Sequence, residues 1–190
     1  MEAVELDISD PASIERVAAN LVADHPELNV LINNAGIMQP DAVGGGIDVA
    51  QMVSIVTTNL IGPIRMTSAL IEHLKTRSDG VVVYTSSVLG FVPKAVPAVY
   101  SSTKAALHSY VLSQRFMLQD TTVRVLEIAP PWVRTELMNS EEAEIAMPLD
   151  QFIDETIKVL GTPGEHDFVN SFNAQMKAMM GSWFPKPTGT

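Results

Sequence analysis

Val81-Val82-Val83-Tyr84, set between Gly80 and Thr85-Ser86-Ser87, is the stretch that decides the fold. Its apolar side chains occupy consecutive positions, which predicts a strand buried on both faces over 80–86. Two further short apolar runs, 29–32 and 123–128, have the same character. Strands with both faces buried are typical of parallel sheets that helices cover on both sides.

The segments between these strands carry helical patterns. Asp10-Pro11 is an N-cap signal, and the apolar spacing behind it predicts a helix over 11–24. Longer helices are expected over 47–76 and 98–119, the first with a kink at Gly62-Pro63. Helices of this length serve as crossover connections, so the fold class is α/β, a Rossmann-like doubly wound parallel sheet.

The remaining sequence is organised around this sheet, and the whole of 1–190 is expected to form a single domain. Residues 3–7 alternate like the end of a strand. Towards the C-terminus we expect a substrate-loop and C-terminal helical segment over 138–184. It is divided into a helix at 149–160, a turn at 161–164 and a Met-rich apolar segment at 168–180, and a frayed tail follows at 185–190.

Composition excludes several classes of function. The 190 residues include 12 Lys and Arg against 22 Asp and Glu, a formal charge of −10, which disfavours nucleic acid and anionic membrane surfaces as partners. With no Cys there is no disulfide or thiolate metal site, and the four His show no metal-binding spacing, so no metal is expected. An acidic start and the lack of a long apolar run favour a cytoplasmic protein.

Tyr100 and Lys104 carry the first chemical signal. Their spacing puts both side chains on one face of the expected helix over 98–119. A Lys ammonium near a phenol favours the phenolate and lowers the pKa of the Tyr, which can then act as a general acid or base. The alternative is an ordinary exposed helix pair, and the spacing by itself does not decide between them.

Two strand ends carry further polar residues. Ser86-Ser87 ends the Val-rich strand, at the edge of the sheet where doubly wound proteins place their sites. The Ser hydroxyl either binds a substrate carbonyl or caps the following loop. Asn33-Asn34-Ala35-Gly36 is equally open to interpretation as a site or as a plain strand-exit turn.

Taken in order, these motifs resemble the short-chain dehydrogenase/reductase family. The resemblance rests on Asn33-Asn34-Ala35-Gly36, Thr58-Asn59-Leu60, Ser86-Ser87, the Tyr100 to Lys104 motif and Pro130-Pro131-Trp132-Val133-Arg134-Thr135, and it covers about Leu6 to Leu137. Ala129-Pro130-Pro131 and Ala106-Leu107-His108-Ser109-Tyr110 are similar to a DltE-like branch.

The resemblance implies a role for each matching residue. The catalytic group would consist of Asn59, Ser87, Tyr100 and Lys104, with Tyr100 as general acid/base in hydride transfer between NAD or NADP and a small carbonyl or alcohol substrate. Lys104 and Tyr100 would also meet the cofactor. The other implied cofactor contacts are Asp7 and Ile8 at the adenine, Asn34, Ala35 and Gly36 along the cleft, and Pro130, Pro131, Val133 and Thr135 at the nicotinamide. The resemblance also implies a homodimer or homotetramer, with the helices 47–76 and 98–119 at the dimer faces.

The sequence also departs from this family. The Thr-Gly-x-x-x-Gly-x-Gly turn and the first two strands that open family members are absent from it, so we expect weak pyrophosphate binding and no readable choice between NAD and NADP. Pro131 stands where most members have Gly, which removes a backbone donor. The 29–32 strand would also be left as an open apolar edge.

Three functions therefore stay open. The first is a dehydrogenase or reductase that is part of a longer product. The second is a truncated, catalytically inactive fragment that survives as a partner-binding subunit. The third and weakest is a sugar-nucleotide epimerase or dehydratase, which shares the Tyr-x-x-x-Lys motif but needs a longer chain after Leu137.

Overall fold

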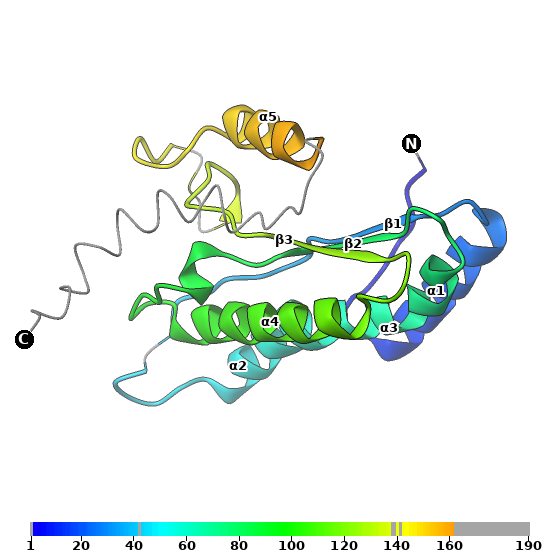
Figure 1. The fold of residues 1–190 in the computed structure, drawn as a ribbon. Coiled ribbons are helices and arrows are strands. Elements are labelled where there is room, and N and C mark those ends of the chain that lie inside the picture. Colours follow the sequence, from blue (N-terminus) through cyan, green and yellow to red (C-terminus); the bar gives the residue numbers. More distant parts are fainter. Residues whose placement is uncertain (1, 42, 138–139, 141, 162–190) are drawn as a thin grey trace, which may run out of the picture.

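The fold is built on a parallel sheet, as the strand patterns predict. The computed structural model describes residues 2–41, 43–137, 140 and 142–161. In these residues three strands, β1 (Val30–Asn33), β2 (Val81–Thr85) and β3 (Arg124–Ile128), pair in parallel in the order β1-β2-β3 (Figure 1). Each strand differs from its expected range by one residue or so at the ends.

Helices cover both faces of this sheet (Figure 1). On one face lie α1 (Pro11–Asp24), α3 (Gly62–Lys75) and α4 (Ala98–Met117), and on the other lies α5 (Leu149–Leu160). The main core lies between the first group of helices and the sheet, with Ile14, Leu70, Leu74, Val82, Tyr84, Leu107 and Val111 almost fully buried. On the α5 side, Val83, Leu126 and Ile128 pack against Phe152, Val159 and Leu160. The doubly wound α/β fold is confirmed.

The helix over 11–24 matches its sequence signal residue for residue. The Asp10 carboxylate accepts hydrogen bonds from the backbone N–H groups of Ala12 (3.0 Å) and Ser13 (3.2 Å). Pro11 follows at the first helical position, where no N–H partner is needed. The cap therefore fixes where α1 begins.

The expected kink near Gly62-Pro63 is a π-helical turn. The helix α2 (Val49–Val56) continues through a π turn, Thr57–Ile61, into α3. Pro63 has no N–H to donate to the carbonyl of Asn59, and its ring would clash with that carbonyl in a regular helix. The Gly62 N–H bonds instead to the carbonyl of Thr57, five residues back. The irregularity thus precedes the proline and includes Asn59.

The expected strand at 3–7 is wrong. The described residues 2–7 include no strand, because an extended segment needs a hydrogen-bonded neighbour and these residues lie against α1 instead, where the Asp7 N–H donates to Ser13 Oγ at 3.1 Å. The β1 edge is open along the described chain, with Val30 41% and Ile32 58% exposed. The prediction of an apolar open edge is confirmed.

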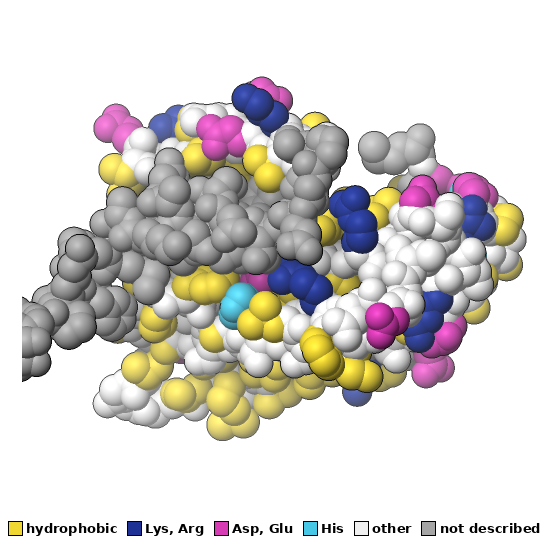
Figure 2. Space-filling view, in the orientation of Figure 1, with side chains coloured by type: hydrophobic (Ala, Val, Ile, Leu, Met, Phe, Trp, Pro, Cys, Tyr) yellow, Lys and Arg dark blue, Asp and Glu magenta, His cyan; other side chains and the backbone are white. Residues whose placement is uncertain are grey.

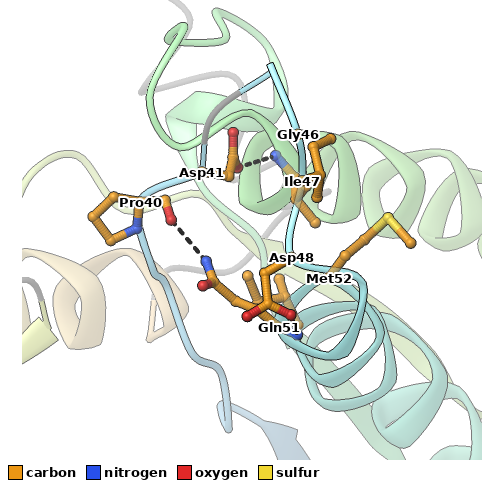
Figure 3. A pocket seen from close by; sticks show the side chains of 9 residues that line it. Pro40, Asp41, Gly46, Ile47, Asp48, Gln51 and Met52 are labelled. Carbon is orange, nitrogen blue, oxygen red and sulfur yellow. Dashed lines mark hydrogen bonds between the residues drawn. The ribbon is translucent and has the colours of Figure 1, made fainter. Parts of the chain in front are cut away.

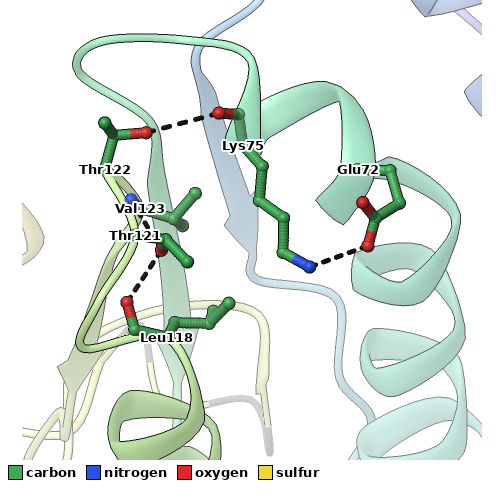
Figure 4. Close-up of polar contacts among 6 residues, drawn as sticks. All are labelled: Glu72, Lys75, Leu118, Thr121, Thr122 and Val123. Atoms are coloured by element: carbon green, nitrogen blue, oxygen red, sulfur yellow. Dashed lines mark hydrogen bonds and ion pairs between the residues drawn. The ribbon is translucent and has the colours of Figure 1, made fainter.

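Polar contacts stabilise the segments that lead into the amino ends of β2 and β3 (Figure 4). Lys75 Nζ pairs with Glu72 Oε1 at 2.8 Å, and Thr121 Oγ1 donates to the carbonyl of Leu118 at 2.7 Å.

No described helix is long and apolar enough to cross a membrane. The expected turn at 161–164 beyond Gly161, the Met-rich segment at 168–180 and the tail at 185–190 lie outside the described residues.

Candidate active site

Ser87 and Tyr100 meet at the carboxyl end of the sheet. Ser87 follows β2 and caps a short 3₁₀ turn, Val88–Gly90, by accepting from the Leu89 N–H at 3.1 Å. This turn packs closely on α4, because a Cβ at Gly90 would stand 2.9 Å from the Lys104 carbonyl carbon. Tyr100 lies in the first turn of α4, and its phenol is close enough to the Ser87 side chain for that hydroxyl to lower the pKa of Tyr100. Both side chains are buried.

Lys104 lies one helical turn further along α4 and is also buried. Its Nζ donates to the backbone carbonyl of Thr85 at 2.7 Å and lies 5.6 Å from the centre of the Tyr100 ring. Burial lowers the pKa of Lys104 to about 8. The Tyr-x-x-x-Lys spacing therefore does place both groups on one face, as expected.

The pKa of Tyr100 moves in the direction opposite to the sequence-based expectation. Burial raises it, and the hydrogen bond from Ser87 lowers it by less. Among the described residues, the Lys104 ammonium donates to the Thr85 carbonyl and makes no hydrogen bond to the Tyr100 phenol oxygen. The expected net lowering is thus not found, because desolvation by burial raises the pKa of Tyr100 and Ser87 offsets only part of it.

Asn59 joins this group from the π turn. It is fully buried, and its amide exchanges two hydrogen bonds with the backbone of Ile37: Oδ1 accepts from the Ile37 N–H and Nδ2 donates to the Ile37 carbonyl, both at 2.8 Å. These bonds hold the loop after β1 in place. A Cβ on Gly36 would lie 3.5 Å from Asn59 Oδ1 and 3.6 Å from Lys104 Nζ, so this glycine sits directly beside both.

The other implied cofactor residues are less tightly connected to this group. Asn34 and Ala35 are exposed beside Gly36, and Pro130 accepts the Val88 N–H at 3.1 Å. Val133 is buried, and the Thr135 N–H donates to Ser140 Oγ at 3.2 Å. Pro131 is half-buried.

Asp7 and Ile8 lie on the α1 side of the molecule. The Asp7 carboxylate is exposed and accepts from the N–H and hydroxyl of Ser9, which lowers the pKa of Asp7. Ile8 packs against the core, and its carbonyl lies next to Gly62. Among the described residues, no hydrogen bond or ion pair joins Asp7 or Ile8 to the Ser87, Tyr100 and Lys104 group.

Sequence reasoning missed several groups that shape the site. Thr85 and Ile37 contribute backbone atoms, which no side-chain pattern reveals. Thr103 Oγ1, on the next residue to Lys104, accepts from Asn59 Nδ2 at 3.4 Å. At the rim, Lys94 Nζ lies 5.4 Å above the ring of Trp132.

A buried carboxyl group, that of Glu127, contacts the helix that carries Tyr100 and Lys104. Glu127 on β3 is 1% exposed, and its Oε2 is 2.8 Å from His108 Nδ1 on α4. The His108 ring packs on Phe91, with ring centres 4.5 Å apart, and Phe91 ends the turn that Ser87 begins. Glu127 Oε1 has no hydrogen-bond partner among the described residues. This pair therefore links β3 and α4 to the Ser87 turn.

A cavity of about 330 Å³ opens beside the start of α4 (Figure 3). Asp41 Oδ2 accepts from the Val99 N–H at 2.7 Å, so an acid from the loop after β1 caps α4. Across the cavity, Gln51 Nε2 donates to the carbonyl of Pro40 at 2.7 Å. The cap fixes the helix end that carries Tyr100.

Polar side chains from a strand exit, a helix and a π turn thus converge at the carboxyl end of a parallel sheet, the arrangement of an α/β protein with its site at this edge. The chain belongs to the short chain dehydrogenase family, whose model matches residues 1–146. In the part of the chain that the structure describes, no cluster of His, Asp and Glu suited to a metal is found.

Individual relatives agree with this membership. The uncharacterized oxidoreductase DltE of Bacillus subtilis is 37% identical over 134 residues, 70% of this chain and 53% of that protein. An NADP-dependent 3-hydroxy acid dehydrogenase of Schizosaccharomyces pombe is 32% identical over 70% of this chain and 51% of its own length. An NADPH-bound carbonyl reductase from chicken fatty liver superposes with a TM-score of 0.77 at 27% identity, over 86% of this chain and 71% of that one. This chain spans about half the length of the curated relatives it matches.

Proposed function

We propose that this chain is the catalytic part of an oxidoreductase that transfers hydride between NADP(H) and a small carbonyl or alcohol substrate. The observation that carries the proposal is that the buried Ser87 and Tyr100 side chains lie together at the end of the sheet, with the Lys104 ammonium 5.6 Å from the centre of the Tyr100 ring. The names of the relatives support NADP in preference to NAD, since one is an NADP-dependent dehydrogenase and another binds NADPH.

The residues present fit the nicotinamide end of a dinucleotide. Lys104 donates one of its three N–H groups to the Thr85 carbonyl among the described residues. The other two can donate to the hydroxyls of a ribose. Gly36 has no side chain between the loop after β1 and Lys104 Nζ, so a ligand can approach there. When bound, the cofactor supplies or accepts the hydride.

The proton chemistry falls to Tyr100 and Ser87. Because burial raises its pKa, the Tyr100 phenol is protonated at neutral pH and can give its proton to a carbonyl oxygen. Ser87 orients that oxygen and stabilises the negative charge that grows on it as hydride arrives at the carbon. Lys104, with a pKa of about 8, is positively charged at pH 7 and stabilises the phenolate left behind. In the oxidative direction Tyr100 takes the proton back.

The test measures NADPH binding by fluorescence and NADPH oxidation with a panel of aldehydes and ketones. Tyr100→Phe is expected to lower kcat by about 10²–10⁴-fold and to leave NADPH binding within about twofold, since the phenol proton is used in the reaction itself. Tyr110→Phe is the matched control, because Tyr110 lies on the same helix and packs, partly buried, against the main core. Undiminished turnover in Tyr100→Phe would remove the residue from this role.

A partner-binding role without catalysis is the second candidate, favoured by the open β1 edge with its exposed Val30 and Ile32. Pairing with another strand would satisfy this edge. NADPH binding distinguishes the two candidates: a chain that binds a partner strand but shows no NADPH binding at millimolar concentration supports the second.

We also propose a homodimer through the helical side of the molecule. Val49 and Val53 on α2, and Leu112 and Phe116 on α4, are exposed apolar residues, and Figure 2 shows hydrophobic side chains gathered along the edge where α2 lies. Light scattering should give a mass of two chains, and Val53→Glu with Phe116→Glu should give one.

A further inference from the structure

Lys94 and Trp132 meet across the two strand exits that frame the candidate active site. Lys94 lies in the loop between the Ser87 turn and α4, and Trp132 lies in the loop after β3. The ammonium stands 5.4 Å from the centre of the indole ring, a cation–π distance. Both residues are exposed, so the pair forms part of the rim of the site.

A short path of contacts ties this pair to Ser87. The Val88 N–H, next to Ser87, donates to the carbonyl of Pro130 at 3.1 Å, and Trp132 follows Pro130 by two residues. Two residues span at most about 7 Å. The Trp132 backbone is held in turn, because its carbonyl accepts the Met147 N–H at 2.8 Å. Lys94 is therefore fixed over the same sheet end as Ser87.

Among the described cationic side chains near this site, the Lys94 ammonium keeps all its N–H donors available. Lys104 donates to the Thr85 carbonyl, and the Arg134 guanidinium donates to the carbonyls of Ala143 and Glu144. Lys94 has neither a hydrogen bond nor an ion pair to any other described residue, although the chain carries a formal charge of −10. A positive charge kept free of the surrounding acids suits an anionic ligand.

We propose that the substrate carries a carboxylate and that Lys94 binds it, while Trp132 packs on the apolar part of the same molecule. The substrate class is then a hydroxy or oxo carboxylate, with its alcohol or carbonyl group at Tyr100. This assignment rests on the proposed function for the reacting group, but the anion site itself needs only Lys94 and Trp132. Lys94 acts in binding and leaves the hydride step to the buried residues.

The binding test uses Trp132 fluorescence. Trp183→Phe removes the second of the two tryptophans, so the remaining emission reports on Trp132. The probes are 3-hydroxybutyrate and its uncharged amide, titrated into this variant in the presence and absence of NADP⁺. We expect the carboxylate to bind about tenfold more tightly than the amide, and Lys94→Gln to remove this difference. Lys75→Gln is the matched control, since it removes the same charge at the opposite end of the sheet.

The kinetic test compares the two probes as substrates. Lys94→Gln should raise KM for 3-hydroxybutyrate about tenfold with little change in kcat, and should leave both constants for the amide unchanged. Equal binding of acid and amide, no binding of either, or wild-type binding in Lys94→Gln would overturn the anion site. Lys94-dependent binding without any NADP⁺ reduction would uphold this site and overturn the proposed function instead.

Discussion

Two buried polar clusters lie on the helix-rich side of the sheet, and they are built in different ways. In the core cluster, the Tyr84 hydroxyl is hydrogen-bonded to Thr67 Oγ1 (2.8 Å) and Gln114 Oε1 (2.9 Å), and Asn33 Nδ2 also donates to Thr67. In the site cluster, Ser87, Tyr100 and Lys104 are held partly by backbone atoms such as the Thr85 carbonyl.

The difference distinguishes a polar cluster that stabilises the fold from the cluster that we propose to be catalytic. Side chains of the core cluster satisfy one another, and burial raises the pKa of Tyr84 so far that its phenol stays neutral. The site cluster leaves the Lys104 ammonium with unused donors although it is buried. The first arrangement stabilises the fold, whereas the second costs stability and keeps groups available for a ligand.

The largest expected effect on the free energy of unfolding concerns Glu127 and His108. One oxygen of Glu127 is paired and the other has no described partner, so this pair is intermediate between the two clusters. His108→Ala removes the partner of Glu127 Oε2 and leaves a carboxyl group, 1% exposed, with neither oxygen bonded to a described residue. We expect the free energy of unfolding to fall by about 3 kcal/mol in urea denaturation. Combining it with Glu127→Leu should recover part of that loss, because no polar group is then left unpaired.

The matched control for this pair is His73→Ala, since His73 Nε2 contacts only a backbone carbonyl, that of Leu28, at 3.0 Å. Its expected cost is about 1 kcal/mol. If His108→Ala cost no more than the control, the Glu127 pair would belong with groups that contribute little to stability.

An effect of similar size is expected at Lys104, and it depends on pH. The pKa of Lys104 is about 8 in the folded protein and 10.5 in the unfolded chain. Between these values the unfolded chain binds more protons, so stability rises with pH across this window; below about pH 8 the buried ammonium costs roughly 3 kcal/mol. Lys104→Met should therefore be more stable than the wild type at pH 7, with the advantage lost by pH 10.5.

The measurement for Lys104 is urea denaturation at a series of pH values, with Lys75→Met as the exposed control. A difference between Lys104→Met and wild type that does not change from pH 7 to 10.5 would show that the ammonium is not destabilised by burial. The same variant should lose turnover, which separates its stability from its activity.

Tyr84→Phe tests the core cluster directly. Loss of the hydroxyl leaves Thr67 and Gln114 without that partner, and we expect a loss of about 2 kcal/mol in thermal or urea unfolding. Turnover should persist, the reverse of the behaviour expected for Tyr100→Phe. A Tyr84→Phe variant that folds normally but lacks activity would break the distinction between the two clusters.

The smallest expected effect is at Ser87. Its hydrogen bond lowers the pKa of Tyr100, so Ser87→Ala should shift that pKa further upward. The shift is read from the ultraviolet absorbance of tyrosinate during a pH titration, after subtracting the same titration of Tyr100→Phe. Ser86→Ala serves as control, because Ser86 Oγ donates to the Ile128 carbonyl instead. A downward or absent shift would contradict the Ser87 bond.

The sequence by itself predicted most of the helices and strands and singled out the residues that we propose to react. Asp10-Pro11 and the apolar spacing place α1, the Val-rich runs place the strands, and the Tyr100 to Lys104 spacing puts both side chains on one helix face. These features depend on neighbours along the chain, so local rules of capping and periodicity suffice to predict them.

Only the tertiary structure decided which elements pair and which side chains contact one another. Residues 3–7 have the pattern of a strand but no neighbour to pair with, and the Lys104 ammonium bonds to Thr85, a residue of another element. The pKa of Tyr100 rises because desolvation depends on everything packed around the phenol, and the contact between Lys94 and Trp132 joins loops from two different strands. Pairing, burial and charge separation depend on distance in space, and the spacing of residues along the chain does not record that distance.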